Sequence, residues 1–464
     1  MAGAEVKQLG NEPVGRLLMR YAVPAVIAMT ASSLYNIVDR IFIGHIGSGS
    51  EGALALSGLA VTFPIMNLSA AFGAMVGVGG STLISIKLGQ RDYKTAERVL
   101  GNVVTLNVIV GLLLAVFGIL FIDPLLYFFG ASPQSEPYAR DYMFVILLGN
   151  VVTHLYLGLN AALRSTGHPN LAMSATIATV IANSILDPLF IFTFNMGIRG
   201  AAIATILAQI IALVFVWYCL SRRDEVIRLR SGIYALRKRI VRNILSIGLS
   251  PFSMQLCACL VVILINKGLQ RHGGDLAIAA YGIINGITFL FIMVVMGITQ
   301  GMQPIAGYNY GAQNYGRVNQ VLRFSILYAT VVMCISFVIC EFIPHLPVRL
   351  FTEDAQLTDL SIDGMRIIVS MHPIVGFQIV VGNFFQSIGM PRKSIFLSVS
   401  RQMLFLLPFL LIFPGIWGTN GVWLSIAASD LISAITAAIM LLASPFPSKG
   451  GVTENHPPIT VQQV

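Results

Sequence analysis

Residues 99–122 read VLGNVVTLNVIVGLLLAVFGILFI and contain no charged side chain. In a helix that rises 1.5 Å per residue, a segment of this length crosses the roughly 30 Å hydrocarbon core of a bilayer. Residues 171–186 and 200–220 are also uncharged and are close to that length or slightly shorter. The pattern therefore predicts a chain built from membrane-spanning helices.

The composition supports the same class. Hydrophobic residues make up 56% of the 464 residues and charged residues 11%, whereas charged residues are about 25% of soluble domains. The mean hydropathy is +0.80. The first fifteen residues carry Glu5, Lys7 and Glu12, and the apolar run after them is too long for a signal peptide core. We expect no cleavable signal peptide.

The cysteines and the basic residues have simple explanations in a membrane protein. All five cysteines fall inside apolar runs and lack zinc-ligand spacing, so we interpret them as packing residues. The net charge of +9 comes from basic residues in the loops between apolar runs, which favours a bilayer and not nucleic acid as the partner. The cysteines are Cys219, Cys257, Cys259, Cys334 and Cys340.

Apolar runs separated by polar, Gly or Pro breaks predict an all-α membrane protein with twelve transmembrane helices. If both termini are cytoplasmic, 22 of the 29 Lys and Arg residues lie on the inner side, as the positive-inside rule requires. We expect a multi-pass protein of the cytoplasmic membrane. The predicted spans are 17–46, 55–83, 99–122, 139–163, 171–194, 200–220, 244–269, 277–305, 319–342, 361–388, 394–414 and 420–443.

The second half of the chain repeats the first at an offset near 222. The repeat predicts an N-lobe at 1–220, a basic cytoplasmic linker at 221–243, a C-lobe at 244–443 and a flexible tail at 444–464. We expect the linker, SRRDEVIRLRSGIYALRKRIVRN, to form an amphipathic helix. The matched residues are Gly89 with Gly311, Tyr93 with Tyr315, Gly167 with Gly389, and Pro169 with Pro391.

Each half holds six spans, an even number, so both halves keep the same orientation. Two parallel six-helix lobes leave a central cleft between them. By analogy with other folds of this kind, the lobes rock to expose the cleft alternately to the two sides of the membrane.

Ionisable residues inside a span are costly and therefore candidates for function. The deep acidic residues are Asp39, Asp187 and Asp430. Asp187 follows Asn183 by one helical turn, and Asp39 and Asp187 both lie about 10 Å below the outer boundary. Thr205 lies at a similar depth, about 8 Å. These oxygen ligands suit a hard cation such as Na⁺.

Two carboxylates that approach each other in a low-dielectric lobe cannot both remain ionised without compensation. One must hold a proton, or a cation must bind between them. The alternative is structural: Asp39 pairs with Arg40, and Asp187 forms a hydrogen bond with a neighbour.

The segment NIVDRIFIG at 36–44 resembles the first-helix motif of the multidrug and toxic compound extrusion (MATE) family. The resemblance extends over nearly the whole chain. It includes the parallel repeat, the basic middle loop, the GQRDY stretch after the second span and the spacing of Asn183 and Asp187. It implies a coupling-cation site for Na⁺ or H⁺ at Asp39, Asn183, Asp187 and Thr205, and a bend-forming proline at Pro24.

The resemblance also implies the activity. The family members are cation-coupled antiporters that export amphipathic, often cationic, organic compounds by alternating access. It implies no cofactor other than the coupling ion, Na⁺ or H⁺. The expected partners are small amphipathic molecules and the lipid bilayer, without nucleic acid, and we expect a monomer.

The chain departs from the family branch that carries acidic residues in the seventh and tenth helices, because its seventh span has Gln255 and no acid. A C-lobe cation site is therefore not expected. Asp430 either faces a cationic substrate in the cleft or is a buried aspartate bonded to a serine at 425, 429 or 433. Candidate residues of the substrate pathway are Tyr35, Asn36, Gln255 and Asp430.

Three other functions remain open. A flippase for a lipid-linked saccharide would favour a strongly cationic cleft, whereas the deep charges found in the sequence are mostly acidic. A membrane-embedded transferase would need a clustered catalytic set, such as His with a nearby Asp, and none is found. A channel fits two distinct halves and an acidic site in one lobe less well than a carrier does.

Overall fold

The structure is a computed structural model that describes residues 4–47, 50–352 and 354–444. In the part of the chain that it describes, the regular secondary structure is helical and no strand is present. The tail predicted to be flexible lies outside the described residues from 445 onward.

The first half of the chain forms one lobe after a short leading helix, α1 (Ala4–Asn11). Its six spans are α2, α3, α4, the bent pair α6 and α7, the pair α8 and η1, and α9; α5 lies between α4 and α6. The bounds are α2 Val14–Gly44, α3 Ser50–Gly89, α4 Tyr93–Leu120, α5 Ile122–Phe128, α6 Glu136–Leu148, α7 Asn150–Ser165, α8 Pro169–Pro188, η1 Leu189–Thr193 and α9 Gly197–Ser221.

The second half forms the other lobe. The long helix α10 turns sharply at Gly274 and therefore supplies two spans, and the run from α15 to α16 does the same at Gly418. With α11 and the bent pair α13 and α14, the described chain has twelve spans, as predicted. The bounds are α10 Lys238–Gly311, α11 Tyr315–Phe342, α12 His345–Arg349, α13 Ala355–Val369, α14 His372–Ser387, α15 Pro391–Val399, η2 Ser400–Leu406 and α16 Leu407–Leu442.

The internal repeat is visible in the backbone itself. Positive φ angles recur at an offset of 221 or 222: Arg91 (59°) with Gln313 (58°), Gly167 with Gly389, and Gly197 with Gly418. The side chains of Asp92 and Asn314 cap α4 and α11 at equivalent positions. The bends between α6 and α7 and between α13 and α14 are 55° and 54°. The repeated turns therefore impose the same helix order on both lobes.

The prediction of an amphipathic helix in the basic linker is wrong. Residues 222–237 contain no helix, and the chain lies along the N-lobe with Ile227, Leu229 and Ile233 buried. Apolar residues at 227 and 229 alternate with arginines, which is the period of an extended chain.

Polar side chains of α4 hold this extended backbone. Thr105 donates to the carbonyl of Tyr234 (2.8 Å), and the amide of Arg237 donates to Asn102 (3.0 Å). Tertiary contacts thus satisfy backbone groups that a helix would have paired internally.

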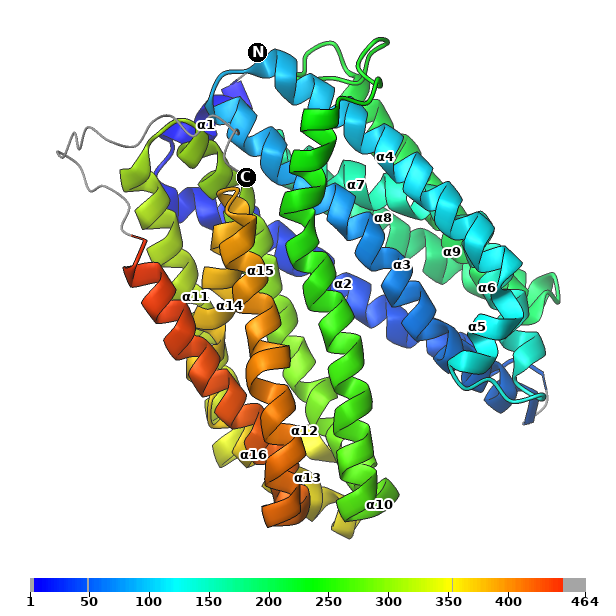
Figure 1. Cartoon of the computed structure of the whole chain (residues 1–464). Helices are drawn as coiled ribbons and strands as arrows, with labels where there is room; N and C mark the ends of the chain where they lie inside the picture. The colour runs from blue at the N-terminus through cyan, green and yellow to red at the C-terminus, as the bar shows by residue number, and fades with distance from the viewer. Residues whose placement is uncertain (1–3, 48–49, 353, 445–464) are drawn as a thin grey trace.

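The two lobes meet where α10 packs against α3 and α2. Glycines allow backbone contact there: a Cβ on Gly248 would lie 1.8 Å from the Met75 carbonyl oxygen, and one on Gly79 would lie 2.0 Å from that of Ile244. Gln303 of α10 donates to Ser81 (2.9 Å) and Thr82 (2.7 Å) of α3. In Figure 1 the lobes lie together at the end that carries the termini and diverge toward the other end.

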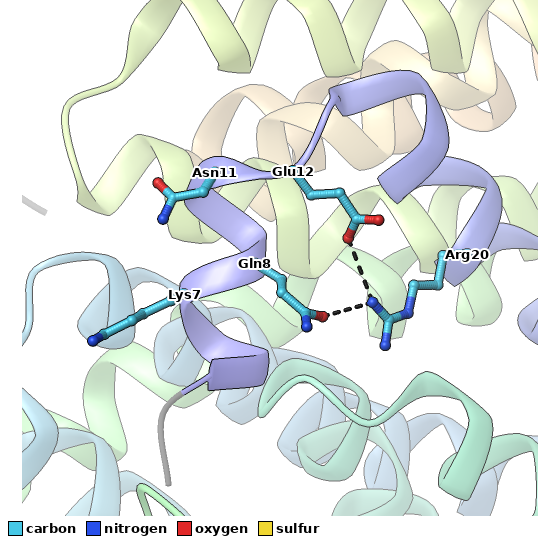
Figure 2. A pocket seen from close by; sticks show the side chains of 5 residues that line it. All are labelled: Lys7, Gln8, Asn11, Glu12 and Arg20. Atoms are coloured by element: carbon cyan, nitrogen blue, oxygen red, sulfur yellow. Dashed lines mark hydrogen bonds and ion pairs between the residues drawn. The ribbon is translucent and has the colours of Figure 1, made fainter. Parts of the chain in front are cut away.

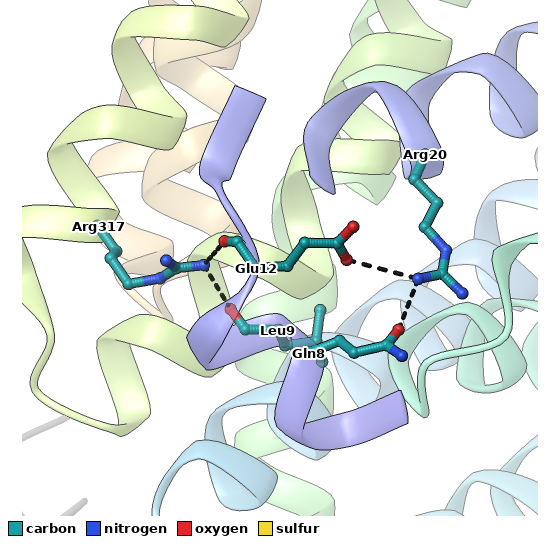
Figure 3. Close-up of polar contacts among 5 residues, drawn as sticks. All are labelled: Gln8, Leu9, Glu12, Arg20 and Arg317. Carbon is teal, nitrogen blue, oxygen red and sulfur yellow. Dashed lines mark hydrogen bonds and ion pairs between the residues drawn. The ribbon is translucent and has the colours of Figure 1, made fainter. Parts of the chain in front are cut away.

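The short helix α1 lies at this junction. Val6 packs in the N-lobe core and Leu9 in the C-lobe core. Figure 3 shows Arg317 of α11 donating to the carbonyls of Leu9 (3.2 Å) and Glu12 (2.6 Å). A surface pocket of about 420 Å³ opens beside α1, and Figure 2 shows Arg20 bridging two of its lining residues, Gln8 and Glu12. Helix α1 therefore connects both lobes at the end that carries the termini.

We predict that Gly248→Ala lowers the melting temperature of the purified protein, because the added methyl group would meet the backbone of Met75. Overpacking of this kind costs about 1–3 kcal/mol. Gly382→Ala is the matched control, since a Cβ there would meet nothing within 4 Å and alanine favours a helix. Thermal unfolding in detergent tests both variants. Equal melting temperatures for the two would contradict the proposed backbone contact between the lobes.

Candidate functional site

The four residues assigned to a cation site come from three helices of the N-lobe, and all four are buried. Asp39 lies in the last third of α2, Asn183 and Asp187 lie one turn apart near the end of α8, and Thr205 lies in the first third of α9. The carboxyl groups of Asp39 and Asp187 lie within interaction range of each other. The structure therefore brings together the carboxylates that the sequence placed at one depth.

Most of the polar atoms in this cluster have no partner. Oδ1 of Asp39, both carboxylate oxygens of Asp187 and both amide atoms of Asn183 are buried without a hydrogen bond. A buried polar group without a partner is costly, and a buried ionised carboxylate more so. These acceptor oxygens therefore form a set that a cation or a proton can stabilise.

Two tyrosines border the carboxylates. The hydroxyl groups of Tyr35 and Thr205 lie 3.2 Å apart, and Thr205 also donates to the carbonyl of Ala201 (3.0 Å). Tyr142 of α6 is buried within electrostatic range of both carboxylates. The sequence analysis missed Tyr142, which lies in the predicted span 139–163 without a pattern that distinguishes it.

The alternative explanation for Asp39, an ion pair with Arg40, is not what the described residues show. Arg40 is exposed and its guanidinium lies 5.3 Å from the ring centroid of Phe63. Asn36 is also exposed and bonds to the carbonyl of Ser32 (2.8 Å). Gln255 is half-buried in α10, in the other lobe.

The donor set decides what the cluster can hold. Among the described residues, no three His, Cys, Asp or Glu side chains gather as a metal site. The N-lobe cluster has two carboxylates, one amide oxygen and one hydroxyl, all of them oxygen ligands. Hard cations prefer such ligands, and a shared proton is equally compatible with two facing carboxylates.

Pro24 lies inside α2, fifteen residues before Asp39, and is buried. Below it, α2 contacts the other lobe: a Cβ on Gly301 of α10 would lie 2.6 Å from the backbone of Ala22. Above it, α2 packs on α8, which carries Asp187. The contact with α10 continues past Pro24, since a Cβ on Gly297 would lie 2.6 Å from Val26. Because proline removes one helical hydrogen bond, Pro24 permits a bend within the lobe contact, before the carboxylate.

Asp430 has a partner that the sequence analysis did not assign. Arg401 of η2 donates through Nε to its Oδ1 at 2.9 Å, and Nη2 lies 2.8 Å from the same oxygen. Nη1 of Arg401 also donates to Gln378 (3.4 Å). The expected bonds from serines are wrong: Ser425 and Ser429 donate to backbone carbonyls, and Ser433 has no partner.

The sequence analysis counted Arg401 among the basic residues of the inner side, at the margin of the predicted span 394–414. In the structure that span begins at Pro391, which places Arg401 about 15 Å along it, near the middle of the bilayer. The π-helical turn η2 carries the residue. Such turns often mark functional sites, but they leave no clear trace in hydropathy.

The comparisons with known proteins agree with this geometry. A family model described as MatE matches residues 24–189 and 248–412, one block in each repeat. The chain belongs to the MatE family. Membership identifies the protein as a transporter and not an enzyme, so the transferase alternative is excluded.

Two curated relatives match this MatE protein over almost its whole length. Multidrug export protein MepA of Staphylococcus aureus (strain MSSA476) is 25% identical over 431 residues, which cover 93% of this chain and 94% of the relative. MepA of Staphylococcus haemolyticus (strain JCSC1435) is 26% identical over 426 residues, covering 92% and 93%. A solved MATE-family multidrug resistance transporter of the MOP superfamily, in an outward-facing conformation, superposes with a TM-score of 0.88 at 26% identity. It covers 96% of this chain and 99% of its own.

We predict that Asp430→Asn destabilises the protein, because it leaves the Arg401 guanidinium unpaired within a span. Removing one member of a buried pair costs about 3–5 kcal/mol. The double variant Asp430→Asn/Arg401→Gln should recover most of the loss, since two neutral amides can bond to each other. Melting temperatures in detergent measure the coupling. Additive losses in the double variant would show that the pair does not interact.

Proposed function

We propose that this MatE-family protein exports amphipathic, often cationic, organic compounds from the cytoplasm in exchange for Na⁺ or H⁺ bound in the N-lobe. The observation that carries the coupling is the set of buried acceptor oxygens without partners on Asp39, Asn183 and Asp187. The names of the MepA relatives support multidrug export. Alternating access follows from two lobes that are in contact at one end.

The coupling acts through charge. When the cation or proton is absent, two facing carboxylates repel each other in a medium of low dielectric. Binding neutralises them and allows α2 and α8 to approach. Because α2 also contacts α10 below Pro24, a change at Asp39 is transmitted to the contact between the lobes.

The flippase alternative is less well supported. It favours a strongly cationic cleft, and the charge of the deep arginine Arg401 in the C-lobe is offset by Asp430. We therefore retain the exporter as the proposal. We further propose that it works as a monomer in the cytoplasmic membrane, with both termini in the cytoplasm.

Asp39→Asn and Asp187→Asn should each reduce gradient-driven efflux about tenfold or more, because each removes the charge that binding neutralises. Thr205→Ala should reduce it about two- to tenfold, since only a neutral ligand is lost. Dye efflux from everted vesicles, with Na⁺ and pH gradients imposed separately, measures the effect and identifies the coupling ion.

Asp141→Asn is the control for these variants. Asp141 forms an exposed ion pair with Arg199 (2.6 Å) in the same lobe, and exposed pairs contribute little. This variant should transport normally. Normal efflux by Asp39→Asn at equal expression would refute the N-lobe cation site.

The proposed topology predicts opposite labelling of two exposed positions, Ser231 in the linker and Gln134 between α5 and α6. In a cysteine-free background, Gln134→Cys should react with an impermeant maleimide added to intact cells. Ser231→Cys should react only after the membrane is permeabilised. Labelling of Ser231→Cys in intact cells would place the termini outside.

A further inference from the structure

The guanidinium of Arg401 has more donors than partners. It carries five N–H groups, and the described residues offer it one carboxylate oxygen of Asp430 and, at 3.4 Å, the amide oxygen of Gln378. Both terminal nitrogens therefore keep N–H groups that can bind a further acceptor.

Exposure separates the two members of the pair. The Arg401 side chain is 28% exposed, whereas that of Asp430 is 5% exposed. The carboxylate is thus covered, whereas the arginine side chain remains partly accessible. A charged group at this depth faces the interior of the bundle or a water-filled space, because exposure to lipid is too costly.

The depth of both residues supports a place on the transport path. Asp430 lies about 18 Å from either end of its span, and Arg401 lies about 15 Å along the preceding one. Transported compounds bind near the middle of the membrane in carriers of this architecture. The pair therefore lies at the level where a substrate would bind.

The groups around the guanidinium determine what it can bind. His372 of α14 lies within electrostatic range of Arg401 and contacts the hydroxyl of Ser336 (2.9 Å). Asp430 is the acid that pairs with Arg401 within 4 Å among the described residues. A cation that approaches the accessible part of Arg401 meets the guanidinium before the covered carboxylate, and is repelled. An anionic group meets two or more free N–H donors.

We propose that Arg401 determines specificity by binding the carboxylate, or a similar anionic group, of zwitterionic transported compounds. Asp430 is then a positioning residue that holds the guanidinium and offsets its charge. This inference rests on the proposed export function and names the residue that would recognise the anionic group of a transported compound. It also replaces the interpretation of Asp430 as a direct partner of cationic substrates.

A pair of dyes tests the inference. A rhodamine methyl ester is a cation, and the matching rhodamine free acid is a zwitterion that differs by one carboxylate. Equilibrium binding of each to purified protein, by fluorescence anisotropy, gives the ratio of the two Kd values. Arg401→Gln, in the Asp430→Asn background that keeps the pair neutral, should shift this ratio about tenfold toward the ester.

A conservative replacement of Arg401 provides a second test. Arg401→Lys retains the charge and loses the planar fork, so the ratio should lie between those of the wild type and the neutral pair. If Arg401 had a merely structural role, its replacement would weaken the binding of both dyes equally and leave the ratio of the two Kd values unchanged. That result, obtained with folded protein, would overturn the inference.

The two proposals fail in different ways. If the wild type binds both dyes and Arg401→Gln/Asp430→Asn leaves their ratio unchanged, the inference fails and the export function stands. If the wild type neither binds nor transports either dye, the proposed function fails, and the inference fails with it. The Asp39→Asn variant should lose coupled efflux while retaining the wild-type ratio, because it lies in the other lobe.

Discussion

A charge placed within the hydrocarbon layer must be neutralised, and the two lobes satisfy this requirement differently. In the C-lobe, Arg401 and Asp430 compensate each other across two neighbouring spans. In the N-lobe, Asp39 and Asp187 have the same sign, and their buried oxygens lack partners. One lobe therefore carries its own counter-charge, and the other holds the pair at which we propose that a cation or proton binds. Both lobes nevertheless have the same arrangement of helices. The repeat therefore sets the backbone, and a few charged side chains make the two lobes different.

Helix α2 connects the N-lobe carboxylates to the contact between the lobes. Its first part packs against glycines of α10, and its last part packs on α8. Pro24 lies within the part that packs against α10. Backbone contacts of this kind do not deform gradually, because a Cβ or a shift of about 1 Å would produce a clash. The lobe contact is therefore suited to two discrete arrangements, with the occupancy of the carboxylates favouring one of them.

The spans and the internal repeat could be predicted from the sequence because both depend on local signals: uncharged runs, and turn glycines such as Gly167 and Gly389. The N-lobe cluster could be predicted because residues at one depth on neighbouring helices meet. The tertiary contacts could not be predicted from the sequence. Thr105 holds the linker in an extended form that its basic composition did not indicate. Arg401 was counted at the inner margin of its predicted span because its neutralising partner lies on the next span, and Tyr142 had no distinguishing pattern.

The length of α2 has a mechanical consequence. From Pro24 to its end at Gly44 the helix is about 30 Å long, so a bend of about 20° at the proline displaces the far end by about 10 Å. The opposite lobe contacts α2 on both sides of Pro24, at Ala22 and at Val26. Asp39 lies on the part of α2 beyond this contact, so a force on its carboxylate exerts more torque about the proline than the same force close to Pro24 would. A side chain at the position of Asp39 therefore has more leverage on the shape of the transporter than the same side chain near Pro24 would have.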